Sequence, residues 1–375
     1  MEADDFAAVL ATVRDLVRKT VLPREAEIER DDELPADIRA TAAHMGLFGF
    51  ALPAIHGGLG LTMAEDVQLA MELGYTVPAL RSLVGTNNGI AGQVIVSYGT
   101  AEQQAHWLPR LASGRAIAAF ALTEAEAGSD PSGMTARAVR DGSEYVITGV
   151  KRFITNAPIA DVFVVFARTD PRDRGISAFL VEAGGRGVTV GARDAKMGQA
   201  GAWTAEVSFD EARVPLTALV GGEEGRGFHA AMSSLARGRL HIAGACVGLA
   251  TRALDEMVSH ASSAKQGGRV IGDFQLVQAL IAESRAELYA GRAMVLAAAA
   301  DYDAGTDRKL GPSCAKLFCS EMAGRVADRC VQVHGGLGYM RGVVAERLYR
   351  DARLYRIYEG TSEIQKLVIA RHLLR

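Results

Sequence analysis

The first third of the chain shows the periodicity of amphipathic helices. Apolar residues recur three or four positions apart near its start, at Phe6, Val9, Leu10, Val13, Leu16 and Val17. Pro23 interrupts this pattern, and further helical patterns cover residues 36–45, 63–73, 88–98 and 102–111. The stretch Gly57-Gly58-Leu59-Gly60 predicts a loop. We therefore expect an N-terminal α-helical domain over residues 1–115.

The pattern changes near Ala116 from helical to strand-like. Residues 134–140 and 144–148 flank the dipeptide Asp141-Gly142, which is typical of a hairpin turn. Apolar runs of strand length follow at 162–167, 176–181, 188–190 and 204–209. Because glycines punctuate these runs, we expect a middle β-domain that resembles a barrel over residues 116–222.

Helical spacing returns after Gly225-Arg226-Gly227 and continues to the end of the sequence. Four long amphipathic patterns cover residues 228–261, 274–302, 312–333 and 364–374. Four such helices fit a bundle that forms a C-terminal domain over residues 223–375. The predicted fold class is α+β, with a helical domain, a β-domain and a four-helix bundle in that order. This order differs from a Rossmann fold, in which strands and helices alternate.

The composition argues against several classes of function. A formal net charge of −3 over 375 residues argues against a basic patch of the kind that binds the phosphates of nucleic acids, so we expect no nucleic-acid partner. No apolar run approaches the roughly 20 residues that cross a bilayer, and the acidic start argues against a signal or transit peptide. The four cysteines form no Cys-x-x-Cys pair and the eight histidines no His-x-x-x-His pair, so we expect no metal site. These features predict a cytoplasmic protein of a reducing compartment.

The segment Ile357-Tyr358-Glu359-Gly360-Thr361-Ser362-Glu363-Ile364-Gln365 places a carboxylate beside a glycine and a hydroxyl at a predicted helix start. A carboxylate in such a turn can be desolvated and act as a general base, and the N–H groups of a helix start can hold an anion. The same residues also fit a capping box, with Thr361 or Ser362 at the N-cap. Taken alone, the segment favours the cap, because capping boxes are common.

A second segment, Ala121-Leu122-Thr123-Glu124-Ala125-Glu126-Ala127-Gly128-Ser129-Asp130, lies where helix gives way to strand. Its small residues would let the backbone approach a flat ligand, and Thr123 and Ser129 offer hydroxyl groups. An ordinary acidic surface loop has the same composition, so this segment alone leaves both interpretations open.

Together the two segments resemble the acyl-CoA dehydrogenase family of flavoproteins, and the resemblance runs in order through nearly the whole chain. The matching blocks are T-E-x-x-x-G-S-D at 123–130, Lys151-Arg152-Phe153-Ile154-Thr155-Asn156, Lys196-Met197-Gly198, Val214-Pro215, residues 221–228, Gly238-Arg239-Leu240, Phe274-Gln275, residues 332–339, Tyr349-Arg350-Asp351 and Tyr358-Glu359-Gly360-Thr361. Each block alone is moderate support, whereas so many blocks in one order argue against chance.

The resemblance implies an FAD-dependent acyl-CoA dehydrogenase that oxidises a fatty or branched acyl thioester to its trans-2-enoyl thioester, as in β-oxidation. It assigns Glu359 as the base that removes the α-proton while hydride leaves the β-carbon for flavin N5. A pKa raised toward neutrality by burial would suit this role. Some branches carry the glutamate where this chain has Gly238, which leaves Glu359 as the base that fits the pattern. Arg239 would be a nearby cation that organises the site.

The resemblance also implies which residues bind the cofactor and the substrate. FAD contacts would come from Leu122, Thr123, Phe153, Thr155, Gln275, Gln332, Gly336 and Thr361, of which Gln275, Gln332 and Gly336 would reach across a subunit boundary. Substrate contacts would come from Ser129, Arg239, Tyr358 and Gly360, with residues 82–90 along the acyl pocket. Of these, Ser129 would bind the pantetheine or phosphate part of CoA. Expected partners are the acyl-CoA, an electron-transfer flavoprotein that accepts the electrons, and further copies of the chain in a homotetramer built as a dimer of dimers.

The chain departs from the family pattern at several positions. Ala264 and Gly267 stand where many members have arginine and phenylalanine, so we expect FAD to be retained somewhat less firmly, with Lys265 as the remaining charge. Phe153 stands where tryptophan is usual, and Ala236 where an acidic residue often helps to bind substrate. These departures leave two alternatives on the same fold: a dehydrogenase of acyl-carrier-protein thioesters, and a flavin oxidase or monooxygenase. A helical scaffold that has lost its cofactor is the non-enzymatic alternative.

Overall fold

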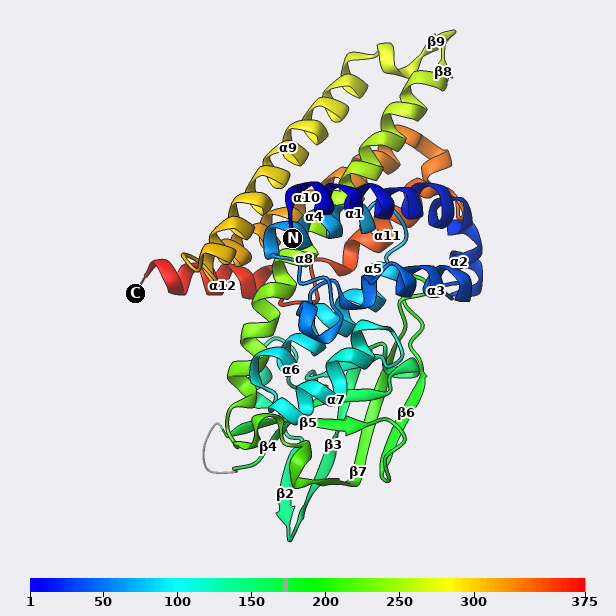
Figure 1. The fold of residues 1–375 in the computed structure, drawn as a ribbon. Coiled ribbons are helices and arrows are strands. Elements are labelled where there is room, and N and C mark those ends of the chain that lie inside the picture. Colours follow the sequence, from blue (N-terminus) through cyan, green and yellow to red (C-terminus); the bar gives the residue numbers. More distant parts are fainter. Residues whose placement is uncertain (171–174, 375) are drawn as a thin grey trace.

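The structure is a computed structural model that describes residues 1–170 and 175–374. An N-terminal helical domain, a middle β-domain and a C-terminal helical domain follow one another along the chain, as the sequence predicts. The β-domain lies at one end of the molecule, the N-terminal helices lie in the middle, and the long C-terminal helices project at the other end (Figure 1).

The N-terminal domain contains α1 (Ala3–Asp15), α2 (Glu25–Asp31), α3 (Ala36–His44), α4 (Met63–Leu73), α5 (Ala79–Val84), α6 (Gly92–Tyr98) and α7 (Ala101–Ala112). The prediction of one helix over 88–98 is wrong at its start, because Gly85–Ala91 forms wider π-type turns before α6. The buried amides of Asn87 and Asn88 donate to the carbonyl oxygens of Phe48 and Val84, at 3.1 and 2.6 Å. Side-chain bonds of this kind compete with the regular helical ladder.

The β-domain is a sheet in the order β1-β4-β2-β3-β7-β6, with β5 paired to β4. Its strands are β1 (Ala118–Ala121), β2 (Arg137–Asp141), β3 (Glu144–Thr155), β4 (Val162–Arg168), β5 (Ile176–Glu182), β6 (Val188–Arg193) and β7 (Thr204–Pro215). The hairpin predicted at Asp141-Gly142 is confirmed and joins β2 to β3. The sequence analysis missed β1, which is too short for a period to show and pairs in parallel with β4.

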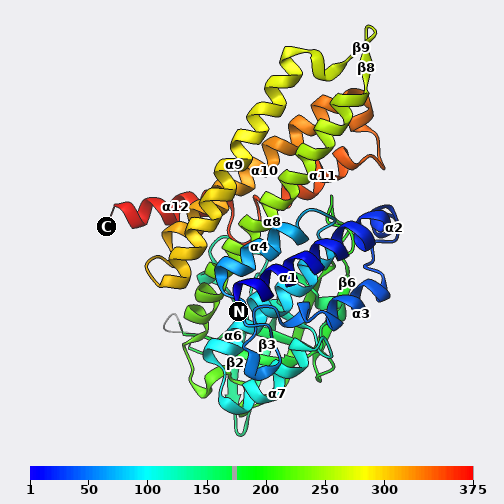
Figure 2. The same ribbon diagram turned by 45° about the horizontal axis from the view of Figure 1, so that its top comes forward.

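The C-terminal domain contains α8 (Gly227–Ser263), α9 (Gln275–Ala304), α10 (Leu310–His334), α11 (Val344–Leu354) and α12 (Ser362–Leu373). The four predicted helices are all present, and α11 is an additional one. The short strands β8 (Lys265–Gln266) and β9 (Arg269–Val270) form a hairpin between α8 and α9. Helices α8, α9 and α10 run alongside one another (Figure 2) and bury mostly small apolar side chains.

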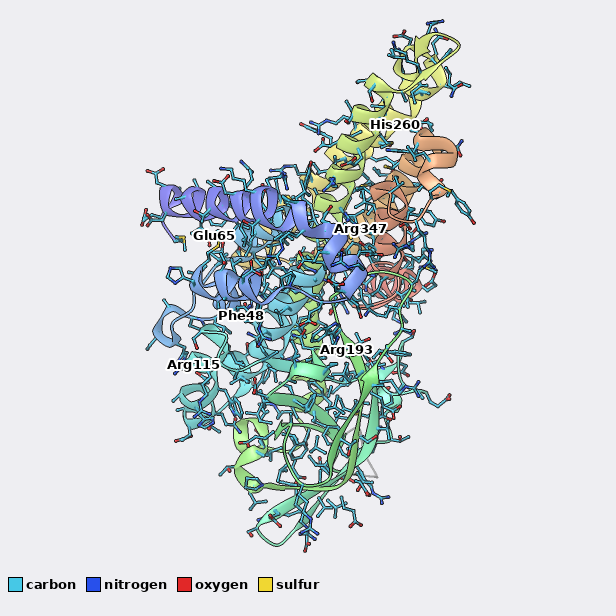
Figure 3. All side chains as sticks on the ribbon, turned by 90° about the vertical axis from the view of Figure 1, so that its right-hand side faces the viewer. Phe48, Glu65, Arg115, Arg193, His260 and Arg347 are labelled. Atoms are coloured by element: carbon cyan, nitrogen blue, oxygen red, sulfur yellow. The ribbon has the colours of Figure 1, made fainter. Side chains whose placement is uncertain are left out.

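Buried ion pairs join the domains around the base of the bundle. Arg347 of α11 forms an ion pair with Glu25 of α2, 2.8 Å away, and lies where the N-terminal helices meet the bundle (Figure 3). Asp351, one turn further along α11, accepts a hydrogen bond from the backbone N–H of Gln199 in the β-domain. These contacts fix the segment that follows α11 against both other domains. Within residues 1–170 and 175–374, every helix is too short or too polar to cross a membrane.

Candidate active site

Glu359 occupies a strained turn between α11 and α12. Its φ is +57° and that of Gly360 is +82°, a left-handed conformation that costs free energy for a residue with a side chain. Lys316 of α10 donates from Nζ to the carbonyl oxygen of Gly360 at 2.7 Å. Gln365 donates from Nε2 to the carbonyl oxygens of Glu359 and Gly360 at 3.0 and 3.1 Å. Side chains of two helices therefore hold the turn in its costly shape.

Thr361 caps α12, as the simpler interpretation of this segment predicts. Its hydroxyl accepts a hydrogen bond from the backbone N–H of Ile364 at 3.2 Å. A full capping box is not formed, since the third position of the helix holds an apolar side chain. The cap and the strained turn are adjacent parts of one segment, and the cap fixes where α12 begins.

The carboxylate of Glu359 is buried at one oxygen. Oε2 is shielded from solvent and has no hydrogen-bond partner within the described part of the chain, although the residue as a whole is half-buried. Burial raises the pKa of Glu359 to about 7, against the opposing effects of Arg239, Lys316 and Arg81. A carboxylate with a pKa near the working pH is suited to take a proton from a weak acid.

Gly238 of α8 provides the space for this carboxylate. A Cβ atom at position 238 would lie 2.8 Å from Glu359 Oε2 and 3.3 Å from Cδ1 of Ile90. The first distance is shorter than van der Waals contact allows, so any side chain at position 238 would displace the carboxylate. Because Gly238 has no side chain, α8 carries no carboxylate at this position and leaves room for the carboxylate of Glu359.

Gly238→Ala is therefore expected to reduce activity without reducing stability. The added methyl group moves the flexible end of Glu359, and a displacement of about 1 Å can cost about 10²-fold in rate. Alanine favours a helix over glycine, so the thermal midpoint should hold or rise. Stopped-flow flavin bleaching and thermal unfolding measure the two effects. Gly244→Ala is the contrasting control, because its Cβ would lie 2.6 Å from the carbonyl oxygen of Val67 and should reduce stability. Wild-type bleaching in Gly238→Ala would contradict the placement of the carboxylate.

Arg239 is near enough to this carboxylate for each charge to affect the pKa of the other. Desolvation lowers the pKa of Arg239 and the charge of Glu359 raises it. Its Nη1 is 3.5 Å from the hydroxyl of Ser313, and its Nε is buried with no partner among the described residues. The arginine is half-buried on α8.

A buried ion pair shapes the loop that contains Leu122 and Thr123. Lys151 of β3 donates from Nζ to Glu124 at 2.8 Å and to the carbonyl oxygen of Leu122 at 3.0 Å. Glu124 also accepts from the backbone N–H groups of Thr135 and Ala136 at 2.6 and 3.0 Å. Both charges are almost fully buried, so the loop is held rigidly against β3. The sequence analysis gave neither Glu124 nor Lys151 a role.

Phe153 presents an exposed aromatic ring beside this loop. The pairing of β3 with β7 shifts between Lys151 and Ile154, and within this bulge Phe153 has a φ of +58° and is 63% exposed. The backbone N–H of Arg152 donates to the carbonyl oxygen of Thr123 at 2.9 Å, which brings Phe153 close to the loop. Thr155 ends the same strand and is half-buried. An aromatic ring held outward in a costly conformation, beside a rigid loop, fits the planar ring system of FAD.

The structure places the other predicted FAD residues at the far end of the bundle. Gln275, Gln332 and Gly336 are exposed. Gln275 follows the β8–β9 hairpin, which lies at the end opposite the β-domain (Figure 1). His334, next to the glycine loop, stacks on His260 near the end of α8, at 4.2 Å between ring centroids. Within one chain these residues do not lie beside Phe153, so they would reach FAD only from another subunit.

The predicted substrate residues divide into two groups. Tyr358 and Gly360 lie in the Glu359 turn, and the Tyr358 hydroxyl accepts a hydrogen bond from Arg81 at 2.9 Å. Ser129 is exposed on the 123–130 loop. The sequence analysis missed Arg81 and Lys316. For Lys316 the available signal was a cation within the apolar helical pattern over 312–333, whereas no predicted helix covered Arg81.

Comparisons with known proteins show the family of the chain. The sequence matches the profiles described as "Acyl-CoA dehydrogenase, N-terminal domain" over residues 3–115, "Acyl-CoA dehydrogenase, middle domain" over 119–212 and "Acyl-CoA dehydrogenase, C-terminal domain" over 225–374. The acryloyl-CoA reductase (NADH) of Anaerotignum propionicum is 40% identical, over 94% of this chain and 90% of that protein.

Two solved structures resemble the chain along its whole length. Butyryl-CoA dehydrogenase of Megasphaera elsdenii superimposes with a TM-score of 0.96 at 31% identity, over 100% of this chain and 99% of that chain. An acyl-CoA dehydrogenase of Bacillus anthracis, complexed with FAD, superimposes with a TM-score of 0.93 at 31% identity, over 100% of this chain and 67% of that chain. The rigid loop and the exposed Phe153 fit the same cofactor here. This chain belongs to the acyl-CoA dehydrogenase family of FAD-dependent oxidoreductases.

Proposed function

We propose that the chain is an acyl-CoA dehydrogenase that removes one hydrogen from each of the α- and β-carbons of an acyl-CoA, giving the trans-2-enoyl-CoA. The observation that carries this proposal is the carboxylate of Glu359, buried and unpartnered at Oε2 in the described structure and beside Arg239. A buried carboxylate whose pKa is near neutrality is a general base, and acyl-CoA oxidation needs one at the α-carbon.

The chain's own residues would perform the proton transfer and position the thioester. Glu359 takes the α-proton, and its backbone N–H donates to the thioester oxygen as negative charge develops there. Arg239 and Lys316 stabilise the ionised form of Glu359, since each lowers its pKa. FAD, held by Leu122, Thr123, Phe153, Thr155 and Thr361, supplies a hydride acceptor when bound.

Electron transfer and assembly form the second part of the proposal. Reduced FAD must pass its electrons to another protein, and an electron-transfer flavoprotein is the proposed acceptor. Large apolar side chains are exposed around the predicted subunit contact: Leu276, Leu337, Tyr339 and Met340 are between 52% and 85% exposed. Exposure of this kind favours burial against another copy of the chain, in the proposed homotetramer.

Anaerobic flavin bleaching tests the proposed reaction. Holoenzyme mixed with straight, branched or aromatic acyl-CoAs should lose flavin absorbance with at least one of them and form an enoyl-CoA. Matched acyl-carrier-protein thioesters test the alternative carrier. Enoyl-CoA with chemically reduced enzyme tests the reverse reaction, which the name of the relative from Anaerotignum propionicum suggests. Absence of bleaching with every saturated thioester would contradict the proposal.

The rate should rise with pH through the titration of Glu359. Only the ionised carboxylate accepts a proton, so kcat/KM should rise as the pH increases to about 7 and level off at higher pH. Arg239→Gln removes a cation that lowers this pKa, so the midpoint of the profile should move upward. The linked stability has the opposite sign: the pKa of Glu359 is raised from 4.5 by folding, so its contribution weakens as pH rises through this range. A flat profile across neutrality would contradict the base assignment.

A further inference from the structure

Buried cations in this protein divide sharply into paired and unpaired. Five lysine or arginine side chains are buried among the described residues: Arg81, Lys151, Arg252, Lys316 and Arg347. Three have close carboxylates: Lys151 pairs with Glu124 at 2.8 Å, Arg252 with Glu256 at 2.7 Å, and Arg347 with Glu25 at 2.8 Å. Arg81 and Lys316 have no carboxylate oxygen of a described residue within 4.0 Å. Both unpaired cations lie against the Glu359 turn.

Arg81 is the less satisfied of these two. Lys316 donates to a carbonyl oxygen at 2.7 Å, which partly compensates its charge. Arg81 donates from Nη2 to the Tyr358 hydroxyl at 2.9 Å, while its Nε is buried without an acceptor in the described structure. The arginine is 4% exposed, so bulk solvent hardly reaches its charge. Burial of a guanidinium without an anionic partner costs free energy, and the folded structure nevertheless buries Arg81 in this way.

Arg81 also directly precedes residues 82–90, which the resemblance places along the acyl pocket. It belongs to α5, which continues directly into the turns that carry Ile90. The side chains of Ile90 and Glu359 both lie close to the point where a Cβ atom of residue 238 would be. The segment that carries Ile90 therefore faces the carboxylate of Glu359. The predicted CoA contact, Ser129, is instead exposed on the 123–130 loop. This placement favours the acyl group over the CoA phosphates as the source of an anion that meets Arg81.

The charges near the base have an excess of positive sign. Arg81, Arg239 and Lys316 all act electrostatically on Glu359. None of the three forms a close ion pair with another described carboxylate. The single carboxylate of Glu359 becomes neutral when it takes a proton. A second negative charge from the substrate would balance the site throughout the reaction.

We propose that the acyl group carries a carboxylate at its end distant from the thioester, and that the guanidinium of Arg81 binds this carboxylate through Nε and a terminal nitrogen. The inference rests on the proposed function, since it names the acyl group for that site. Arginine suits the role because its planar fork matches a carboxylate with two parallel hydrogen bonds. The substrate class is the CoA monothioesters of dicarboxylic acids.

A purely structural role for Arg81 makes a different prediction. If Arg81 only holds Tyr358, then removing the Tyr358 hydroxyl should change substrate choice as much as removing the guanidinium. Tyr358→Phe is thus the matched control: it removes the hydrogen bond and leaves the positive charge in place. Arg81→Lys keeps the charge and removes the fork.

The test compares thioesters of equal chain length with and without a distal carboxylate. Glutaryl-, adipyl- and pimelyl-CoA are paired with pentanoyl-, hexanoyl- and heptanoyl-CoA, and kcat/KM is measured on the holoenzyme of wild type, Arg81→Met, Arg81→Lys and Tyr358→Phe. Wild type should prefer the carboxylated member of at least one pair by roughly 10- to 100-fold, the range expected of hydrogen bonds to charged groups. Arg81→Met should lose this preference, Arg81→Lys should keep part of it, and Tyr358→Phe should retain it.

A binding measurement keeps the test informative if a variant is slow. Dissociation constants of each pair, followed by the perturbation of the flavin spectrum in the Glu359→Gln background, should show the same preference and the same loss on Arg81→Met. Neutral thioesters that react and bind as well as their carboxylated partners would overturn the inference and leave the proposed function standing. A preference that survives Arg81→Met would also overturn it. Absence of bleaching with both series would overturn the proposed function and the inference with it.

Discussion

Glu359→Gln should abolish substrate-dependent flavin bleaching, with a loss of about 10²–10⁴-fold or more. Glutamine has the shape of glutamate, but its amide cannot accept the α-proton. The turn is held by Lys316 and Gln365 through backbone oxygens, so its conformation should survive the substitution. The visible spectrum of bound FAD and the thermal midpoint should therefore remain close to those of wild type. Stopped-flow absorbance under anaerobic conditions measures the rate.

Glu363→Gln provides the matched control for this experiment. Glu363 lies one turn further on, in the first turn of α12, and is exposed. The same change of charge is made there on the same segment, without removal of the buried carboxylate. Wild-type bleaching is expected in the control. A Glu359→Gln enzyme that bleaches as fast as the control would show that another group removes the proton.

Lys151→Met should produce the largest loss of stability that the structure predicts. The substitution leaves the charge of Glu124 buried without its partner, a change that typically costs about 3–5 kcal/mol. It also removes the hydrogen bond to the carbonyl oxygen of Leu122, which anchors the loop beside Phe153. The thermal midpoint should fall clearly, and less FAD should remain bound after gel filtration.

The double variant Lys151→Met/Glu124→Gln separates charge from packing. It removes both charges and keeps one side-chain oxygen, which can accept from the backbone N–H of Thr135 while the hydrogen bond from Ala136 is lost. Replacement of a buried pair by neutral groups is commonly close to neutral in stability. The double variant should therefore recover much of the loss. A single variant as stable as wild type, or a double variant no more stable than the single, would contradict this account.

The long helices and the turn around Glu359 could be predicted because their signals are local. Hydrophobic periods of a dozen residues or more located the long helices, and the turn around Glu359 combines a glycine with a cap at Thr361. Helix α11 escaped because many of its positions are charged and only one narrow face is buried. Strand β1 escaped because it is as short as a chance apolar run.

The remaining features depend on pairings between distant segments. The outward turn of Phe153 arises from a register shift against β7, which no period within β3 reveals. Arg81, Lys316 and Arg347 all lie on helices of the structure, but only Lys316 lies within a helical pattern that the sequence analysis located. Whether each meets a carboxylate is decided by other domains: Arg347 finds Glu25 near the start of the chain, whereas Arg81 finds a phenol. The sequence therefore shows that a cation is present, and the fold shows which cation has no carboxylate partner among the described residues.

The expectation of weaker FAD retention concerns the hairpin after α8. Lys265, which the sequence analysis names as the remaining charge, begins β8. Arg269 lies on the facing strand β9. The guanidinium of Arg269 stands over the ring of Phe274, 5.2 Å from its centroid. A second cation is therefore available on this hairpin, which the sequence analysis did not consider.

Deuterium at the α-carbon tests the central claim most directly. Single-turnover bleaching of the wild-type holoenzyme should be slower with an α-dideuterated acyl-CoA than with the unlabelled thioester, because the Cα–H bond breaks as Glu359 takes the proton. Glu359→Gln should show no measurable bleaching with either the labelled or the unlabelled thioester. Equal rates for labelled and unlabelled thioester in wild type, with bleaching retained in the glutamine variant, would show that the carboxylate of Glu359 is a bystander.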